Sequence, residues 1–449
     1  MPEKSIELTK TLAHFIAKTE KSNIPSHVFD HAKVAFKDWL GVTFAGKNDP
    51  LVEKLIKFAD LMGGHKQVTL LGYGVKKTAC QAALINGAAS HVLDYDDTLE
   101  HFLGHPSVTI FPSILALSEW MEKSGSNFLT AYIIGLKVGA VIGACGGIEH
   151  YMSGCHPTST LGHFASAAAC AKLLGLDEKQ SANALGIAGT QASGLKISFG
   201  TMSKAFHAGK ASQSGLMAAL LARDGFTGAE DVIEGAHGFF KVFKGNVSED
   251  VVNTIGKTWE IEDLAQKYHA SCHATHSPIE AARFIIQKEG LELNDIKEIR
   301  VFSSALALSA ASKMEANTGL EGKFCIPYCV ANALLNENTG MQAFTEEKIN
   351  DPELKAFMKK ITVNTTQDFQ ALQARVEIET KSGRAYTAVS DILKIIPELQ
   401  EKKSKISAKF KDLCSPVLGN PTADAMDMAV DSLETIDNMK TFVKSVQKE

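Results

Sequence analysis

The sequence has few of the features expected of a nucleic-acid-binding or metal-cluster protein. Its 46 Lys plus Arg residues are outnumbered by 51 Asp plus Glu residues, which gives a formal net charge of −5. A surface that tracks phosphates needs an excess of basic residues, so we expect no nucleic-acid partner. The eight cysteines are dispersed, and none forms the Cys-x-x-Cys pair of a zinc ribbon or iron–sulfur cluster. This usage indicates a reducing compartment.

Long uninterrupted apolar segments are also scarce. Residues 1–10 include the charged side chains of Glu3, Lys4 and Glu7 and lack the apolar core of a secretory signal, so we expect a cytoplasmic protein. The most apolar run, residues 128–147, contains Lys137 and five glycines. Because small residues let helices pack closely, we predict a buried helix here and no membrane partner.

Length and hydrophobic periodicity together predict two domains. A chain of 449 residues exceeds the roughly 250–300 residues at which a single core usually stops growing. From residue 6 to about residue 266, apolar residues recur at helical spacing, and they do so again after Lys402. Two of the predicted helical segments, residues 163–174 and 214–222, are rich in alanine, which lets helix axes approach closely.

Between these helical parts the pattern changes. The segments with strand, turn or helix patterns are residues 278–288 (helix), 296–302 (strand), 328–335 (helix), 374–380 (strand), 381–384 (turn) and a strand from Ala385. The predicted fold class is therefore mainly α. An all-helical domain is formed by both chain ends, residues 1–266 and 401–449, and a smaller α/β domain, residues 267–400, is inserted between them.

The residues that suggest chemistry are His and Lys side chains at the starts of predicted helices. His105 and His156 each precede a proline, which is favoured in the first turn of a helix. After His156, a hydroxyl group is expected to cap the helix, from Thr158, Ser159 or Thr160. Lys204 and His207 lie at the approach to the predicted helix at residues 214–222.

Free backbone N–H groups and the helix dipole favour anions at such positions, and a nearby imidazole or ammonium group adds donors or charge. Each residue alone has a simpler explanation as a local cap, a turn residue or a surface cation. Several helix starts that converge would bind a small molecule with two or three carboxylates.

An acidic segment, residues 91–98, could complete such a site. On a helix, Asp94 lies three residues from Asp97 and four from Thr98, so these side chains would share a face. Two close carboxyl groups raise each other's proton affinity, which suits one of them to general acid–base work. A solvated helix end whose charges complement the dipole would give the same pattern.

Three other functions fit parts of this pattern. A metal-dependent hydrolase of helical fold could draw ligands from these His and Asp residues, but the neighbouring pair here is the reversed Asp30-His31. A cluster-dependent hydratase would need a third ligand near Cys325 and Cys329. A noncatalytic helical scaffold gives no reason for polar groups to gather at three helix starts.

Seven segments, in this order along the chain, resemble the MmgE/PrpD family, whose members include 2-methylcitrate dehydratases, cis-aconitate decarboxylases and iminodisuccinate epimerases. The segments are residues 91–98, 104–107, 156–162, 200–207, 225–228, 273–276 and 324–331. The resemblance implies a helical domain built from both chain ends, a smaller α/β lid domain, a homodimer, and catalysis without a metal or an organic cofactor.

The resemblance also implies the residues of the site. The active-site pattern of the decarboxylase members falls on Asp94, Thr98, His105, His156, Lys204, Lys267 and Tyr328. We expect the catalytic residues to be Asp94, His105, His156, Lys204 and Tyr328. We expect the substrate-binding residues to be Thr98, His207, Lys267, Cys272 and His273. Cys272 is a departure, because the decarboxylases have a functional His at the position that aligns with it.

These family activities share the handling of a carbon beside a carboxylate. Removal of its proton creates a carbanion, whose charge must be met by preplaced cations and donors such as Lys204, Lys267 and His156. In this scheme Asp94 or His105 moves the proton. We therefore expect a cofactor-independent lyase that acts on a small di- or tricarboxylate. A 2-methylcitrate dehydratase is the first candidate, and an iminodisuccinate epimerase or a cis-aconitate decarboxylase is the alternative.

Overall fold

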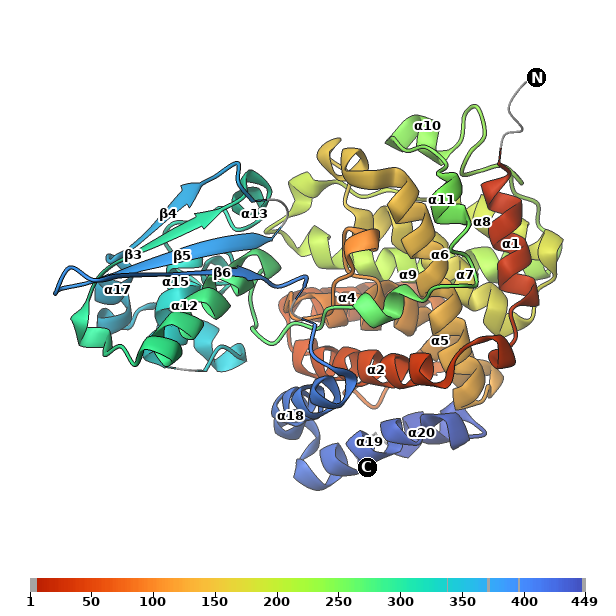
Figure 1. The fold of residues 1–449 in the computed structure, drawn as a ribbon. Helices are drawn as coiled ribbons and strands as arrows, with labels where there is room; N and C mark the ends of the chain where they lie inside the picture. Colours follow the sequence, from red (N-terminus) through yellow and green to blue (C-terminus); the bar gives the residue numbers. More distant parts are fainter. Residues whose placement is uncertain (1–5, 337, 370–371, 395, 446–449) are drawn as a thin grey trace, which may run out of the picture. The chain divides into compact units, whose positions relative to one another are not determined.

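The computed structural model describes residues 6–336, 338–369, 372–394 and 396–445 (Figure 1). By its internal contacts the chain divides into two compact units. Unit 1 comprises Met1–Gln266 and Glu398–Glu449, and unit 2 comprises Lys267–Pro397. Most described residues of unit 1 are helical and the described strands are short, so the predicted mainly α fold class is confirmed.

Unit 1 consists chiefly of α-helices. Their bounds are α1 Leu8–Lys18, α2 Ser26–Gly46, α3 Pro50–Met62, α4 Ala79–His91, α5 Ser107–Met121, α6 Gly125–Met152, α7 Pro157–Leu174, α8 Glu178–Gly189, α9 Met202–Arg223, α10 Phe239–Phe243, α11 Glu249–Val252, α18 Leu399–Leu418, α19 Asn420–Asp431 and α20 Met439–Ser445. One feature departs from the expected all-helical domain. Strands β1 Val68–Thr69 and β2 Lys76–Lys77 pair antiparallel, because Gly72 and Gly74 adopt positive φ angles and turn the chain back.

The helices from the two chain ends pack together in unit 1, where α18 and α19 lie along α2 (Figure 1). Two buried ion pairs join them. The Nζ atom of Lys409 in α18 lies 2.6 Å from Oδ1 of Asp38, and Nζ of Lys37 in α2 lies 2.5 Å from Oδ1 of Asp427. Because an unpaired buried charge is costly, each pair ties a C-terminal helix to α2.

Helix α6 is buried, as predicted for residues 128–147. It is long and apolar enough to span a membrane, but 94% of its most apolar window is buried inside the protein. Lys137 in this helix is 1% exposed, and its Nζ atom donates a hydrogen bond to Oε1 of Glu260 at 2.6 Å. The charge within the apolar run is therefore paired inside the core.

Helices α4 and α9 cross where two glycines face each other. A Cβ atom added to Gly209 would lie 2.1 Å from the carbonyl oxygen of Leu84, and one added to Gly87 would lie 2.7 Å from Cα of Gly209. The alanine-rich part of α9 packs just as closely on α7, since a Cβ at Gly215 would lie 2.4 Å from Cβ of Ser166. Small residues thus set the helix spacings in unit 1.

Unit 2 combines helices with a small sheet. Among its described residues four strands form a sheet in the order β4-β3-β5-β6: β3 Ile296–Ser303, β4 Ile361–Thr365, β5 Gln373–Thr380 and β6 Ala385–Asp391. Strands β3 and β4 are parallel, whereas β5 and β6 form the predicted hairpin. The helices are α12 His276–Glu289, α13 Ala305–Ala310, α14 Gly319–Gly322, α15 Ile326–Leu335, α16 Glu346–Ile349 and α17 Pro352–Met358. Helices α12 and α15 lie on one face of the sheet (Figure 1).

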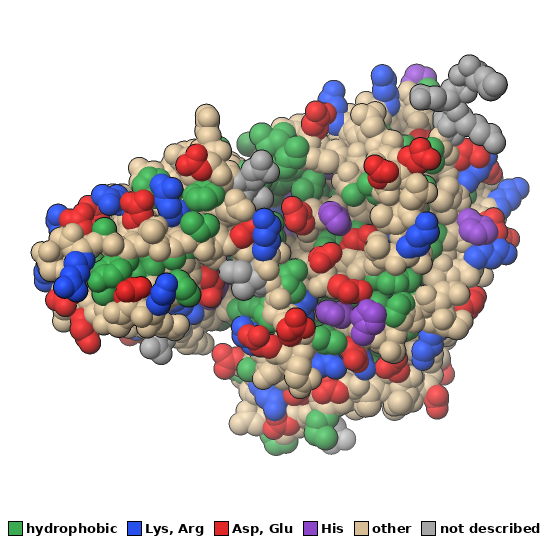
Figure 2. Space-filling model, in the orientation of Figure 1, with side chains coloured by type: hydrophobic (Ala, Val, Ile, Leu, Met, Phe, Trp, Pro, Cys, Tyr) green, Lys and Arg blue, Asp and Glu red, His purple; other side chains and the backbone are tan. Residues whose placement is uncertain are grey.

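Acidic and basic side chains are interspersed on the face of the molecule drawn in Figure 2. No extended basic patch is visible among the described residues on that face. This distribution agrees with the small negative net charge of the sequence and offers no phosphate-tracking surface there.

The crossing of α4 and α9 gives a stability prediction. Gly209→Ala is expected to lower the free energy of unfolding by about 1–3 kcal/mol, because its methyl group would overlap the backbone of Leu84. Gly146→Ala in α6 is the control, since its nearest neighbour would be at an ordinary 3.6 Å and alanine favours helix. Urea unfolding measures both variants. Equal stabilities for the two would contradict this account of the packing.

Candidate active site

Four helix ends of unit 1 carry polar side chains, and the residues at three of them were predicted. Helix α4 ends at His91, and α7 starts at Pro157 with His156 as its N-cap residue. His105 lies two residues before the start of α5, at Ser107. Helix α9 starts earlier than predicted, at Met202, so Lys204 and His207 lie in its first two turns.

The predicted capping of α7 by a hydroxyl group is wrong. Thr158, Ser159 and Thr160 all lie inside the helix, because Pro157 takes the first helical position and leaves His156 at the cap. The Oγ1 atom of Thr158 instead accepts a hydrogen bond from the backbone N–H of His105 at 3.1 Å. That bond links the segment before α5 to the start of α7.

The helix predicted over residues 91–98 is also wrong. Helix α4 stops at His91, and Asp94 has a φ angle of 51°, in the left-handed region that ends helices. Asp94 and Asp97 therefore do not share a helix face. Asp94 contacts Lys204, whereas Asp97 accepts hydrogen bonds from the backbone N–H and the hydroxyl group of Ser107.

This acidic loop, residues 92–98, is anchored from several helices. Lys409 of α18 donates a hydrogen bond to the carbonyl oxygen of Tyr95 at 2.7 Å, and its Nζ atom lies 3.7 Å from the centre of the Tyr95 ring. Thr98 exchanges two backbone hydrogen bonds of 2.9 Å with Ala265. Burial, together with the carboxylate of Asp38, raises the pKa of Asp97 well above its usual value.

The loop brings two carboxylates to a cluster of cations and imidazoles. The Nζ atom of Lys204 donates a hydrogen bond to Oδ1 of Asp94 at 2.6 Å, and Nε2 of His105 lies 3.8 Å from the same oxygen. The other ring nitrogen of His105, Nδ1, lies 2.8 Å from Oδ2 of Asp96. Nδ1 of His91 also contacts Asp96, at 3.0 Å from each carboxylate oxygen. We call these five residues the acid–imidazole cluster.

Two further imidazoles adjoin this cluster. The His156 and His91 rings are stacked with centroids 6.3 Å apart, and Nδ1 of His156 lies 3.1 Å from Nδ1 of His207. Phe199 packs against the His156 ring, with the two centroids 5.0 Å apart. The structure thus brings together, within unit 1, the predicted residues Asp94, His105, His156, Lys204 and His207.

Burial controls the charge of these imidazoles. It lowers the pKa of His91 to about 4, and burial together with the charge of Lys204 lowers the pKa of His156 well below its usual value. Both rings are therefore neutral at pH 7. Burial alone would raise the pKa of Asp96, but the facing imidazoles of His91 and His105 overcome it and hold that pKa well below its usual value.

One atom from each of four cluster residues, His91, Asp94, Asp96 and His105, lies within 4.8 Å of the others, a spacing that a cation could share. However, the ammonium group of Lys204 already contacts Asp94, and two imidazoles already face Asp96. These contacts give Asp94 a cationic partner and Asp96 two imidazole partners within the chain. We therefore assign the cluster to pairing among its own residues.

The remaining predicted residues belong to unit 2, except Thr98. Lys267, Cys272 and His273 are all buried there, and the rings of His273 and His276 lie 4.7 Å apart. Tyr328 is completely buried, and its hydroxyl group donates a hydrogen bond to the carbonyl oxygen of Ala343. Burial raises the pKa of this tyrosine.

Sequence reasoning missed His91 and Asp96 as members of the cluster. Both lie in the acidic segment that was recognised, but a helical model of that segment directs attention to Asp94 and Asp97. Only the left-handed turn at Asp94 turns Asp96 toward His91 and His105. A His five residues before an Asp was the available signal, and it is weak on its own.

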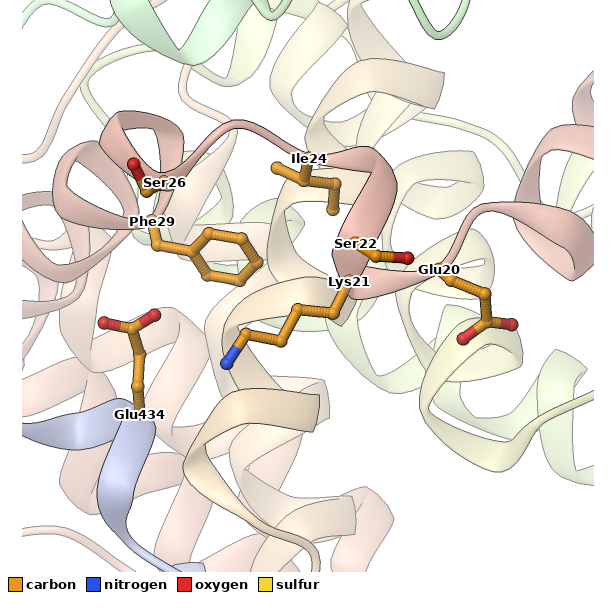
Figure 3. A pocket seen from close by; sticks show the side chains of 7 residues that line it. All are labelled: Glu20, Lys21, Ser22, Ile24, Ser26, Phe29 and Glu434. Carbon is orange, nitrogen blue, oxygen red and sulfur yellow. The ribbon is translucent and has the colours of Figure 1, made fainter.

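A separate pocket in unit 1 is lined by Glu20, Lys21, Ser22, Ile24, Ser26, Phe29 and Glu434 (Figure 3). It shares no residue with the acid–imidazole cluster. The Nζ atom of Lys21 lies 5.5 Å from the centre of the Phe29 ring, and Glu434 forms an ion pair with Lys33. We attach no chemistry to this pocket.

The fold and the cluster together define a class: a mainly helical protein with a buried group of carboxylates, imidazoles and an ammonium at helix ends. Models of the MmgE/PrpD N-terminal domain and the MmgE/PrpD C-terminal domain match residues 10–250 and 269–435. The chain belongs to the MmgE/PrpD family.

Several relatives in this family are named for one activity. A cis-aconitate decarboxylase of Aspergillus terreus is 27% identical over 97% of this chain and 95% of its own length. The cis-aconitate decarboxylases of Mus musculus and Homo sapiens are each 25% identical, over 97% and 96% of this chain and 93% and 92% of their own lengths. The similarity therefore extends over both units.

The buried imidazoles predict a loss of stability at acid pH. Burial lowers the pKa of both His91 and His163 to about 4, so between pH 6.5 and 4 the unfolded chain binds protons that the folded protein does not. Each residue contributes stability above pH 6.5, on the order of 3 kcal/mol, that is lost as the pH falls through 4.

Urea unfolding at pH 7 and pH 5 measures this loss. His163→Gln, which removes one of the buried histidines with a lowered pKa, is expected to reduce the difference in stability between pH 7 and pH 5. A protein that is as stable at pH 5 as at pH 7 would contradict the burial of neutral imidazoles.

Proposed function

We propose that this protein is a lyase that acts on a small di- or tricarboxylate by proton transfer at a carbon beside a carboxylate. The observation that supports this proposal is the contact of Lys204 and His105 with one carboxylate, that of Asp94. An ammonium group, an imidazole and a carboxylate in contact provide an anion-binding charge, a proton donor and a proton acceptor in one place.

The reaction begins when Asp94 or His105 removes a proton from the carbon beside a substrate carboxylate. The electron pair left on that carbon is delocalised into the carboxylate, whose added charge is stabilised by Lys204. In a dehydration, the C–O bond then breaks and the departing hydroxide takes a proton from the other group to leave as water. A decarboxylation instead needs no initial proton removal: the C–C bond to a carboxylate breaks, carbon dioxide leaves, and the electron pair left on the carbon takes a proton from Asp94 or His105.

Dehydration of a substrate of the 2-methylcitrate type is our first candidate. Cys272 stands where the family's decarboxylases have a functional His, and a thiol cannot carry the positive charge of a protonated imidazole. Decarboxylation of cis-aconitate is the second candidate, favoured by the activity named for the relatives from Aspergillus terreus and mammals. Epimerisation of iminodisuccinate needs the same proton removal followed by return to the opposite face.

We further propose, by resemblance to the family, that His156 and Tyr328 take part in catalysis and that substrate-binding roles belong to Thr98, His207, Lys267, Cys272 and His273. The proposal includes catalysis without a metal or an organic cofactor, since the carboxylates of the cluster already face cations and imidazoles of the chain. A homodimer and a cytoplasmic location complete it, the first by resemblance to the family and the second from the dispersed cysteines.

Incubation with 2-methylcitrate, cis-aconitate and iminodisuccinate in heavy water, followed by NMR, identifies the reaction. We expect loss of water from 2-methylcitrate, seen as a new vinylic or allylic signal. Release of carbon dioxide from cis-aconitate would support the second candidate, and deuterium exchange with inversion would support the epimerase. Turnover should persist with a chelator present. Turnover of none of these acids, or activity that a chelator abolishes, would contradict the proposal.

Lys204→Met is expected to lower kcat/KM for the active substrate about 10²–10³-fold, because it removes the cation that meets the developing charge. The matched control is Lys210→Met in the same helix, whose Nζ atom donates to Gln213 and touches no member of the cluster. Lys210→Met should stay within about twofold of the wild type. Steady-state kinetics on both variants, with melting curves to verify folding, makes the comparison. Similar losses in the two variants would show that Lys204 has no special role.

A further inference from the structure

We propose that Asp96 is a positioning residue that holds the His91 and His105 rings in fixed orientations, so that Nε2 of His105 faces Asp94 and the reacting carbon. This inference rests on the proposed function and adds a residue that touches neither substrate nor reacting atoms. Asp96 is 1% exposed, and both of its oxygens are used by imidazoles.

The two contacts of Asp96 fix which nitrogen of each ring carries the proton. His91 donates from Nδ1 to the carboxylate, and Nδ1 of His105 lies 2.8 Å from Oδ2. A carboxylate favours a proton on the nitrogen that faces it. In the neutral form of either ring the proton therefore sits on Nδ1, and Nε2 carries a lone pair.

For His105, this arrangement directs the lone pair of Nε2 to the side where Asp94 and Lys204 lie, 3.8 Å from Oδ1 of Asp94. A ring in the other tautomer would present a proton there and could not act as a base. The His91 ring packs against His105 with centroids 4.7 Å apart, so its own bond to Asp96 also limits rotation of the His105 ring.

The neighbouring Asp97 has none of these contacts. It accepts hydrogen bonds from the backbone N–H and the hydroxyl group of Ser107, which also contacts the hydroxyl group of Tyr132. The amide oxygen of an asparagine has the same shape and can accept these hydrogen bonds. Asp96 and Asp97 are adjacent and equally buried. We nevertheless expect asparagine to impair the reaction at position 96 and to be tolerated at position 97.

The experiment compares Asp96→Asn with Asp97→Asn. Asp96→Asn is expected to lower kcat for the active substrate about a hundredfold or more, within the range of general acid–base effects, while KM changes less than about threefold because Lys204 is retained. Asp97→Asn should keep kcat within about threefold of the wild type. Equal losses of kcat in the two variants, or a loss confined to KM, would overturn the positioning role.

A second measurement uses the wild-type protein. It requires neither that Asp96→Asn and Asp97→Asn fold nor that a substrate is turned over. In ¹⁵N NMR spectra of histidine-labelled protein, protonated and bare ring nitrogens resonate in separate regions. We expect Nδ1 protonated and Nε2 bare in both His91 and His105 at pH 7, with signals assigned from His91→Asn and His105→Asn. The opposite tautomer of His105 would overturn the inference. If no candidate acid is turned over, the proposed function fails while this spectrum still decides the role of Asp96.

Discussion

The site depends on the partners that the chain supplies to two buried carboxylates. Asp94 contacts the ammonium group of Lys204, and Asp96 contacts the imidazoles of His91 and His105. A carboxylate removed from water without such partners would be strongly destabilising or would take up a proton. The acidic loop can therefore bury the carboxylates of Asp94 and Asp96 only where α4, α9 and the start of α5 meet.

The helical scaffold makes this meeting possible. Gly87 and Gly209 let α4 and α9 approach until their backbones touch, and Asp94 follows the end of the first helix while Lys204 lies near the start of the second. The C-terminal helix α18 contributes Lys409, which holds the backbone of the acidic loop at Tyr95. Helices from both chain ends therefore hold the acidic loop in place. This is why unit 1 includes the helices that follow unit 2 in the sequence.

Local signals in the sequence were sufficient for the mainly α class, the buried helix α6 and the β5–β6 hairpin, because periodicity and turn residues act over a few positions. They also indicated that His105, His156 and Lys204 lie near helix starts. They failed at the acidic segment. There the left-handed backbone conformation of Asp94 ends the helix, and the three carboxyl groups of the segment contact different partners instead of sharing a helix face. The role of Asp96 depends on contacts with His91 and His105 that only the folded chain creates.

A crystal structure of the protein with tricarballylate, an unreactive tricarboxylate, would test the central claim most directly. The account predicts that one carboxylate of the ligand lies within hydrogen-bond distance of Lys204 Nζ, with His105 and His156 beside it and Asp96 still between the His91 and His105 rings. The account would be contradicted if tricarballylate bound away from these residues, or if Lys204 and Asp94 lay on separate surfaces.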